Sequence, residues 1–114
     1  LSDIKGRMME DIVLLETKIA NPKKQVFQLQ FAVGEFEMVV ADNANATCEI
    51  YEVKHSKEQA KEQYRHLIDE EKLKSTEFRY GKITKKVVIY RGENATLENG
   101  IEYRNVEDYL KSLL

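Results

Sequence analysis

Residues 35–54 read EFEMVVADNANATCEIYEVK and hold two apolar-rich runs joined by a turn. The first run, Glu35 to Ala41 (EFEMVVA), and the second, Thr47 to Lys54 (TCEIYEVK), each have the length and composition of a strand. Between them lies Asp-Asn-Ala-Asn, and Asp and Asn side chains favour turns because they hydrogen-bond the neighbouring backbone and tolerate left-handed geometry. The short connection therefore predicts an antiparallel hairpin.

A helix and a strand are expected on the N-terminal side of this hairpin. Apolar residues recur at three- and four-residue steps and form one face of an amphipathic helix over residues 3–20, namely Ile4, Met8, Ile12, Leu15 and Ile19. Asn21 and Pro22 end this helix, because proline cannot continue one. Residues 26–33 then alternate apolar side chains with glutamine, which predicts a strand.

On the C-terminal side, Ser56 followed by Gln59 has the spacing of a capping box. We expect a helix to begin there and to continue to about Lys74. The run KKVVIY at residues 85–90 predicts a buried strand because it is apolar and β-branched. A small edge strand at residues 101–104 and a last helix, capped by Asn105, complete the chain.

This order of elements defines the expected fold class. A strand–helix–strand unit over residues 47–90 places its two strands parallel, while the hairpin before it is antiparallel. The prediction is an α/β fold with a mixed central sheet of four to five strands and helices on both faces.

Composition limits the classes of function that are open to the chain. Its 114 residues and 13.3 kDa fit one domain. The net charge of −2 gives no general attraction to DNA or to anionic lipid, and no apolar run reaches the roughly 20 residues of a membrane helix. Cys48 is the single cysteine, so neither an internal disulfide nor a zinc site made of cysteines can form. We expect a cytoplasmic protein without membrane contact.

Acidic residues and a lysine gather along the hairpin. Glu52 and Lys54 are two residues apart and share one side of their strand, as Glu35 and Glu37 do on theirs. The hairpin brings one or both of the latter carboxylates near Glu52, and such oxygen ligands suit Mg²⁺ or Mn²⁺. The spacing is also common by chance, because Glu and Lys alternate on many exposed strands.

The chain resembles the PD-(D/E)XK nuclease fold, a restriction-endonuclease-like core with the order α-β-β-β-α-β. More narrowly, residues 6–114 resemble the C-terminal domain of predicted AAA+ ATPases from bacteria and archaea. Three short motifs carry this resemblance: Gly6 to Glu10 (GRMME), Gly34 to Val40 (GEFEMVV) and Tyr51 to Ser56 (YEVKHS).

The resemblance implies a role for each matching residue. Glu10 corresponds to the helix glutamate, Glu37 to a metal-binding aspartate, Glu52 to the second metal ligand and Lys54 to the catalytic lysine. Glu10 lies beside the apolar face of its helix, so it either borders the sheet and reaches the site or points into water. The family usually has aspartate at the position of Glu37, and the longer side chain moves the ligand oxygen by one methylene.

The resemblance also implies partners. Residues 1–114 would be one nuclease-like domain at the C-terminal end of a longer ATPase, and the upstream AAA+ domain of the same chain would be its partner. The chain contains no phosphate-binding loop of the form GxxxxGK[ST], so we expect no ATP binding by that route.

Three functions remain open from the sequence. The first is Mg²⁺- or Mn²⁺-dependent phosphodiester hydrolysis on DNA, the second is a catalytically inactive module for binding or for regulating the ATPase, and the third is an unrelated interaction domain. Lys57, Lys61 and Arg65 form a basic stripe on the expected second helix that either follows a phosphate backbone or simply faces solvent. Residues 22–56 hold three lysines against five acids, so we expect the isolated domain to cleave nucleic acid poorly.

Overall fold

The computed structural model describes residues 2–114, with side chains from Gly6 onward. It contains three α-helices, α1 (Ser2–Ala20), α2 (Glu70–Tyr80) and α3 (Val106–Ser112). Two short 3₁₀ helices, η1 (Lys61–Gln63) and η2 (Arg65–Ile68), precede α2. The strands are β1 (Gln25–Gln30), β2 (Glu35–Asp42), β3 (Thr47–Val53), β4 (Lys82–Tyr90), β5 (Ala95–Thr96) and β6 (Glu102–Asn105).

The six strands form one mixed sheet in the order β1-β2-β3-β4-β6-β5. The predicted hairpin of β2 and β3 is antiparallel, and β4 lies parallel to β3 as expected from the strand–helix–strand unit. β6 is also parallel to β4, and β5 closes the edge as an antiparallel strand. The α/β class is confirmed. The sheet has six strands instead of the predicted four to five, because the two-residue strand β5 adds one.

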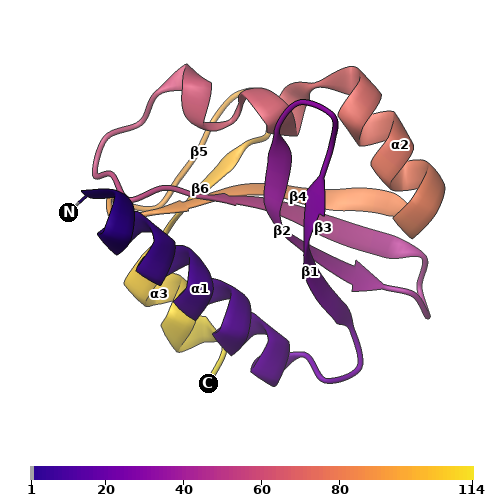
Figure 1. Ribbon diagram of the computed structural model, residues 1–114, viewed down its shortest axis with the longest axis horizontal. Helices are drawn as coiled ribbons and strands as arrows, with labels where there is room; N and C mark the ends of the chain where they lie inside the picture. The colour runs from indigo at the N-terminus through magenta and orange to yellow at the C-terminus, as the bar shows by residue number, and fades with distance from the viewer. Residues whose placement is uncertain (1) are drawn as a thin grey trace.

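Helices cover both faces of the sheet, as the sequence predicts. Figure 1 shows α1 and α3 on one face and α2 on the other. The core under α1 and α3 includes Val13, Met38 and Tyr109, whereas the core on the α2 side includes Phe36, Ile50 and Tyr103. The second and third strands contribute side chains to both cores, because alternation along a doubly covered strand buries both of its sides.

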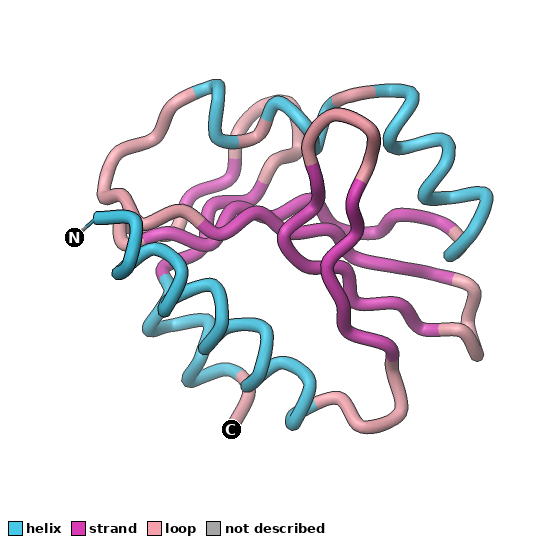
Figure 2. The backbone as a smooth tube through the Cα atoms, in the orientation of Figure 1, coloured by secondary structure: helices cyan, strands magenta, loops and turns pink. Residues whose placement is uncertain are grey.

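An α-helix lies between β3 and β4 as expected, but its predicted bounds, Ser56 to Lys74, are wrong. The Ser56 hydroxyl accepts from the N–H of Glu58 in a local turn and caps no helix. The α-helix begins after Asp69, whose carboxylate accepts from the N–H groups of Glu71 and Lys72. Figure 2 shows the segment before it as loop with short helical turns, so the basic stripe expected on a continuous helix does not exist.

Two buried side chains explain why this segment leaves the helical path. Tyr64 is 8% exposed and Leu67 is completely buried, and both pack into the core on the α2 side. Gln63 links this segment to β6, because its side-chain oxygen accepts hydrogen bonds from the N–H of Ala60 and from the hydroxyl of Tyr103. Tertiary packing of Tyr64 and Leu67 therefore overrides the helical pattern of residues 56–68.

The first helix turns an unexpected side toward the sheet. Val13 and Thr17 are its most buried residues, and the Thr17 hydroxyl hydrogen-bonds that of Tyr109 at 2.7 Å. Four members of the predicted apolar face are instead largely exposed, namely Met8, Ile12, Leu15 and Ile19. The apolar face indicated by the sequence is therefore not the face that packs on the sheet, although α1 itself spans the expected residues. Among the described residues, no helix is both long and apolar enough to cross a membrane.

Candidate functional site

A β-bulge in β2 determines where Glu37 points. Phe27 and Leu29 of β1 pair with Val39 and Phe36 of β2, so β2 has one extra residue in this interval. Phe36 and Val39 both pack in the core on the α2 side, which leaves the bulge at Glu37 and its neighbour Met38. Bulges commonly redirect a side chain next to a functional site. Here the bulge allows Glu37 to face α1.

The hydrogen-bonded register between β2 and β3 ends directly beside the bulge. Its last pair toward this end is Met38 with Tyr51. At the next position the N–H of Glu37 donates to Oε1 of Glu52 at 3.2 Å, and the N–H of Val53 donates to Oε1 of Glu37 at 3.3 Å. Carboxylate oxygens therefore take the place of backbone acceptors where the two strands separate.

Lys54 lies at the end of β3 and faces both acids. Its backbone N–H donates to the carbonyl of Ile89 at 2.8 Å, which fixes the residue beside β4. Its Nζ atom is 3.0 Å from Oε1 of Glu37 and 3.9 Å from Oε2 of Glu52. Glu37 and Glu52 are 8% and 2% exposed, so the lysine is paired with carboxylates that have little access to water.

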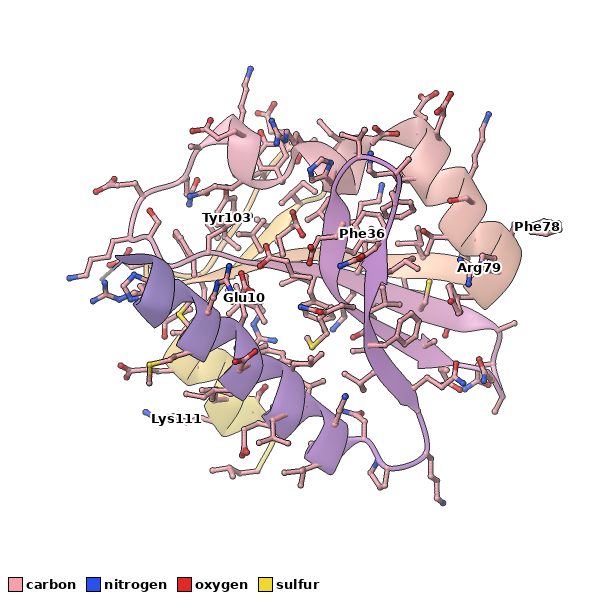
Figure 3. All side chains as sticks on the ribbon, in the orientation of Figure 1. Glu10, Phe36, Phe78, Arg79, Tyr103 and Lys111 are labelled. Carbon is pink, nitrogen blue, oxygen red and sulfur yellow. The ribbon has the colours of Figure 1, made fainter. Side chains whose placement is uncertain are left out.

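Glu10 completes the cluster from α1, where Figure 3 labels it. The helix is held on the sheet by the buried Val13, and Glu10 is three residues earlier, nearly one turn. Glu10 lines the same pocket as Glu37, Glu52 and Lys54, and its carboxyl group is close enough to that of Glu37 to raise its pKa. The four residues singled out from the sequence, Glu10, Glu37, Glu52 and Lys54, therefore come together from α1, β2 and the end of β3.

Burial and like charge raise the pKa values of two of these acids. The pKa of Glu52 rises to about 8, first because the side chain is removed from water and then because of the Glu37 charge. The pKa of Glu10 also rises to about 8, through burial and then through its hydrogen bond with Glu37 and that carboxylate's charge. At neutral pH both are largely protonated. Burial alone would lower the pKa of Lys54, but Glu37 and Glu52 outweigh it and raise that pKa above its usual value.

The cluster lines an open pocket of about 950 Å³. The pocket lies between the N-terminal half of α1, the start of β2, the end of β3 and η2. Its lining residues are Gly6, Arg7, Glu10, Asp11, Gln28, Gly34, Glu35, Glu37, Glu52, Val53, Lys54, His55 and His66. The lining is polar, and it holds five acidic side chains together with the basic side chains of Arg7 and Lys54.

Sequence reasoning missed His66 as a member of this pocket. It lies in η2, between the buried Tyr64 and Leu67, and these anchors bring it over the turn between β1 and β2. Burial and the charges of Lys72, Arg65 and Lys54 lower the pKa of His66, so its ring is neutral at physiological pH.

The signal that could have located His66 is Gly34, the glycine of the GEFEMVV motif. Its φ of +84° is a conformation that other residues seldom adopt. A Cβ atom on Gly34 would lie 2.6 Å from Nε2 and 2.9 Å from Nδ1 of His66. The glycine therefore both makes the turn and leaves space for the imidazole ring.

Replacing Gly34 with alanine is expected to destabilise the protein by about 3 kcal/mol. Positive φ costs roughly 1–2 kcal/mol for a residue with a Cβ atom, and overlap with the His66 ring adds to this. Gly100 is the matched control, because its φ is +87° and a Cβ atom there would have no neighbour within 4 Å. Urea denaturation should show that G100A lowers the free energy of unfolding by about 1 kcal/mol. In a protein that already carries H66A, adding G34A should lower it by a similar amount, because the ring that the new Cβ atom would overlap is gone. Equal losses in G34A and G100A would contradict the placement of His66.

The donor set fits a hard divalent cation, since three carboxylates and no thiolate converge. Among residues 2–114, however, no group of three or more potential ligands already has the arrangement of a metal site. The ammonium group of Lys54 contacts Glu37 in this arrangement. An ion bound to Glu37 and Glu52 would have to share these oxygens with Lys54 or displace it.

No protein-family model, no curated protein and no solved structure matches this chain. The roles of Glu10, Glu37, Glu52 and Lys54 therefore depend on their chemistry and on the resemblance of three short motifs.

Proposed function

We propose that this chain is a nuclease-like domain of the PD-(D/E)XK type that binds Mg²⁺ or Mn²⁺ and acts on a phosphodiester of DNA. The observation that carries the proposal is the convergence of Glu37, Glu52 and Lys54 at the point where β2 and β3 separate, with Glu10 arriving from α1. A buried group of acids with strongly raised pKa values costs stability, and such groups concentrate at functional sites.

The proposed roles follow from position and charge. Glu37 and Glu52 would hold the ion, and Glu10 would be a third carboxylate beside it. When bound, the ion would supply Lewis acidity and an activated water. Lys54 remains protonated at neutral pH because its pKa is raised, so it is suited to stabilise charge on a phosphoryl oxygen and poorly suited to remove a proton.

The same proposal includes a restriction-endonuclease-like core and an ATPase partner. The order α1-β1-β2-β3-α2-β4 agrees with the expected α-β-β-β-α-β core, with α2 beginning later than the sequence suggested. The AAA+ domain upstream in the same polypeptide is the partner that the resemblance implies, and this domain would act under its control.

A catalytically inactive binding or regulatory module is the second candidate. The observation that favours it is the 3.0 Å contact between Lys54 and Glu37, which neutralises the carboxylate without any ion. Glu37 in place of the usual aspartate favours it too, because small displacements of a reacting group cost about a hundredfold in rate. This candidate keeps the pocket but predicts no cleavage.

Calorimetric titration with Mn²⁺ tests the metal site. We expect millimolar or tighter binding by the unmodified protein and loss of the binding heat in Glu52→Gln, which keeps the shape of the side chain. Glu62→Gln is the matched control, since Glu62 is exposed on η1, outside the pocket. Equal heats in the unmodified protein and Glu52→Gln would remove the site.

Incubation with plasmid and single-stranded DNA in Mn²⁺ separates the two candidates. The nuclease candidate predicts cutting that disappears in both Glu52→Gln and Lys54→Met. Binding of Mn²⁺ without cutting would favour the inactive module. We expect slow but detectable cutting by the isolated chain, because its net charge is −2 and the expected basic stripe is absent.

A further inference from the structure

Helix α1 has a second apolar face that points away from the sheet. Its exposed members are Met8, Ile12, Leu15 and Ile19, with exposed fractions of 58%, 47%, 56% and 65%. At 100° per residue these four positions fall within an arc of about 60°, opposite the buried Val13 and Thr17. A helix at the surface of a domain normally has one apolar stripe. Within residues 6–114, nothing buries this outer stripe.

The spacing of the outer stripe is that of a two-helix contact. The steps from Met8 to Ile12, Leu15 and Ile19 are four, three and four residues, which are the a and d positions of a heptad. Isoleucine occupies both a positions, and methionine and leucine occupy the d positions. This pattern fits packing against another helix, and α1 lies at the outside of the molecule, where Figure 1 shows it below the sheet and beside α3.

Charges beside the stripe indicate which helix fits. Asp11 and Lys18 flank it on one side and Glu16 flanks it on the other, and all three are exposed. In a parallel pair of α1 helices, Asp11 would face Glu16 of the second copy, and like charges would repel twice. In an antiparallel pair the flank with Asp11 and Lys18 faces itself, so Asp11 lies near Lys18 of the second copy, again twice.

We propose that a second copy of this chain packs antiparallel against the outer stripe of α1 to form a homodimer. The two-fold axis passes between Ile12 and Leu15, so that each Ile12 meets Leu15 of the second copy and each Met8 meets its Ile19. Such an interface is self-complementary, as closed two-fold symmetry requires. The four residues of the outer stripe do not line the pocket of the proposed metal site, and of the flanking charges only Asp11 does.

Sedimentation equilibrium from about 10 μM to 1 mM tests the dimer, in the range expected for a small interface. The mass should rise from 13.3 kDa toward twice that value as concentration increases. Leu15→Glu should weaken association at least tenfold without loss of helical circular dichroism, because Leu15 is 56% exposed. Phe78→Glu is the matched control, since Phe78 is 92% exposed on α2 across the sheet, and it should change nothing. A monomer at every concentration, or loss of the dimer in Phe78→Glu, would overturn the proposal.

A charge exchange tests the orientation at low ionic strength, where surface charges are least screened. Asp11→Lys and Lys18→Glu should each weaken the dimer about threefold or more, and the double variant D11K/K18E should restore it. In a parallel dimer Asp11→Lys would instead tighten association by facing Glu16. Tightening in that variant, or no change in either single variant, would overturn the antiparallel arrangement. Association with another polypeptide that excludes the second copy would overturn the homodimer itself.

Discussion

Replacing Glu52 with glutamine is expected to stabilise the metal-free protein by about 2 kcal/mol at pH 9 and to change its stability little at pH 5. Glu52 is 2% exposed and its pKa is about 8 in the folded protein, against 4.5 as its ordinary value. Glutamine keeps an oxygen that accepts the N–H of Glu37 and removes the charge that burial opposes. Part of the penalty remains, because Glu10 still faces Glu37.

The pH dependence has a definite sign. Between pH 4.5 and about 8 the folded state holds a proton on Glu52 that the unfolded state releases. The free energy of unfolding of the unmodified protein should therefore fall as pH rises through this window and level off above it. Below pH 4.5 both states are protonated, and the contribution of Glu52 is fully recovered.

Urea denaturation at pH 5, 7 and 9 without divalent cations measures this effect. Glu52→Gln should show a shallower decline with pH, with Glu10 responsible for part of the remaining slope. The exposed Glu62→Gln should follow the unmodified protein. If Glu52→Gln were less stable than the unmodified protein at pH 9, the Glu52 carboxylate would stabilise the fold. The cluster would then have no stability cost from which to argue for a functional site.

Replacing Lys54 with methionine is expected to have the opposite effect and to destabilise the protein by about 2 kcal/mol at pH 8. Glu37 is 8% exposed and would lose its 3.0 Å partner. Removing one partner of a fully buried pair typically costs roughly 3–5 kcal/mol. The value here is smaller because the Lys54 side chain is 34% exposed and water screens part of its charge.

The double variant E37Q/K54M provides the control for this prediction. It removes the unpaired carboxylate together with the lysine and should recover most of the loss at pH 8. A K54M protein as stable as the unmodified one at pH 8 would show that the ion pair has no energetic weight.

Opposite signs in these two experiments would distinguish this cluster from an ordinary surface ion pair. A surface pair contributes little whichever partner is removed. Here three carboxylates meet one lysine, so removing an acid relieves repulsion and removing the base increases it. Above about pH 8, where Glu10 and Glu52 lose their protons, the negative charges of the cluster outnumber the single lysine, and a divalent cation would compensate this excess.

The sequence was sufficient to predict the sheet around the hairpin. Residues 35–54 combine strand composition on both sides with a turn of Asp and Asn, and local chemistry of this kind fixes register without distant contacts. The parallel placement of β4 follows from chain connectivity. Strand alternation also placed Glu52 and Lys54 on one side of β3, but it left open whether Glu35 or Glu37 lies near Glu52.

Prediction from the sequence was wrong in two segments, in each of which one set of apolar residues is buried in place of another. Residues 56–74 have apolar residues at helical spacing, but the burial of Tyr64 and Leu67 bends the chain into two short 3₁₀ helices. The α-helix begins only after its N-cap, Asp69. In α1, Val13 was overlooked because the outer stripe, from Met8 to Ile19, has more apolar members. Periodicity identifies a helix but does not say which of two apolar faces meets the sheet.

The sequence alone thus determined the hairpin, through its local turn, and placed Glu52 and Lys54 on one side of it by strand alternation. Glu10 and Glu37 were singled out only by the resemblance of short motifs. Tertiary structure decided the rest of the site. The bulge that turns Glu37 toward α1 depends on pairing with β1, and Glu10 arrives because Val13 is buried on the sheet. His66 arrives because Tyr64 and Leu67 are buried on the other face. The raised pKa values of Glu10 and Glu52 arise from loss of water and from charges distant in sequence, and neither exists until the chain has folded.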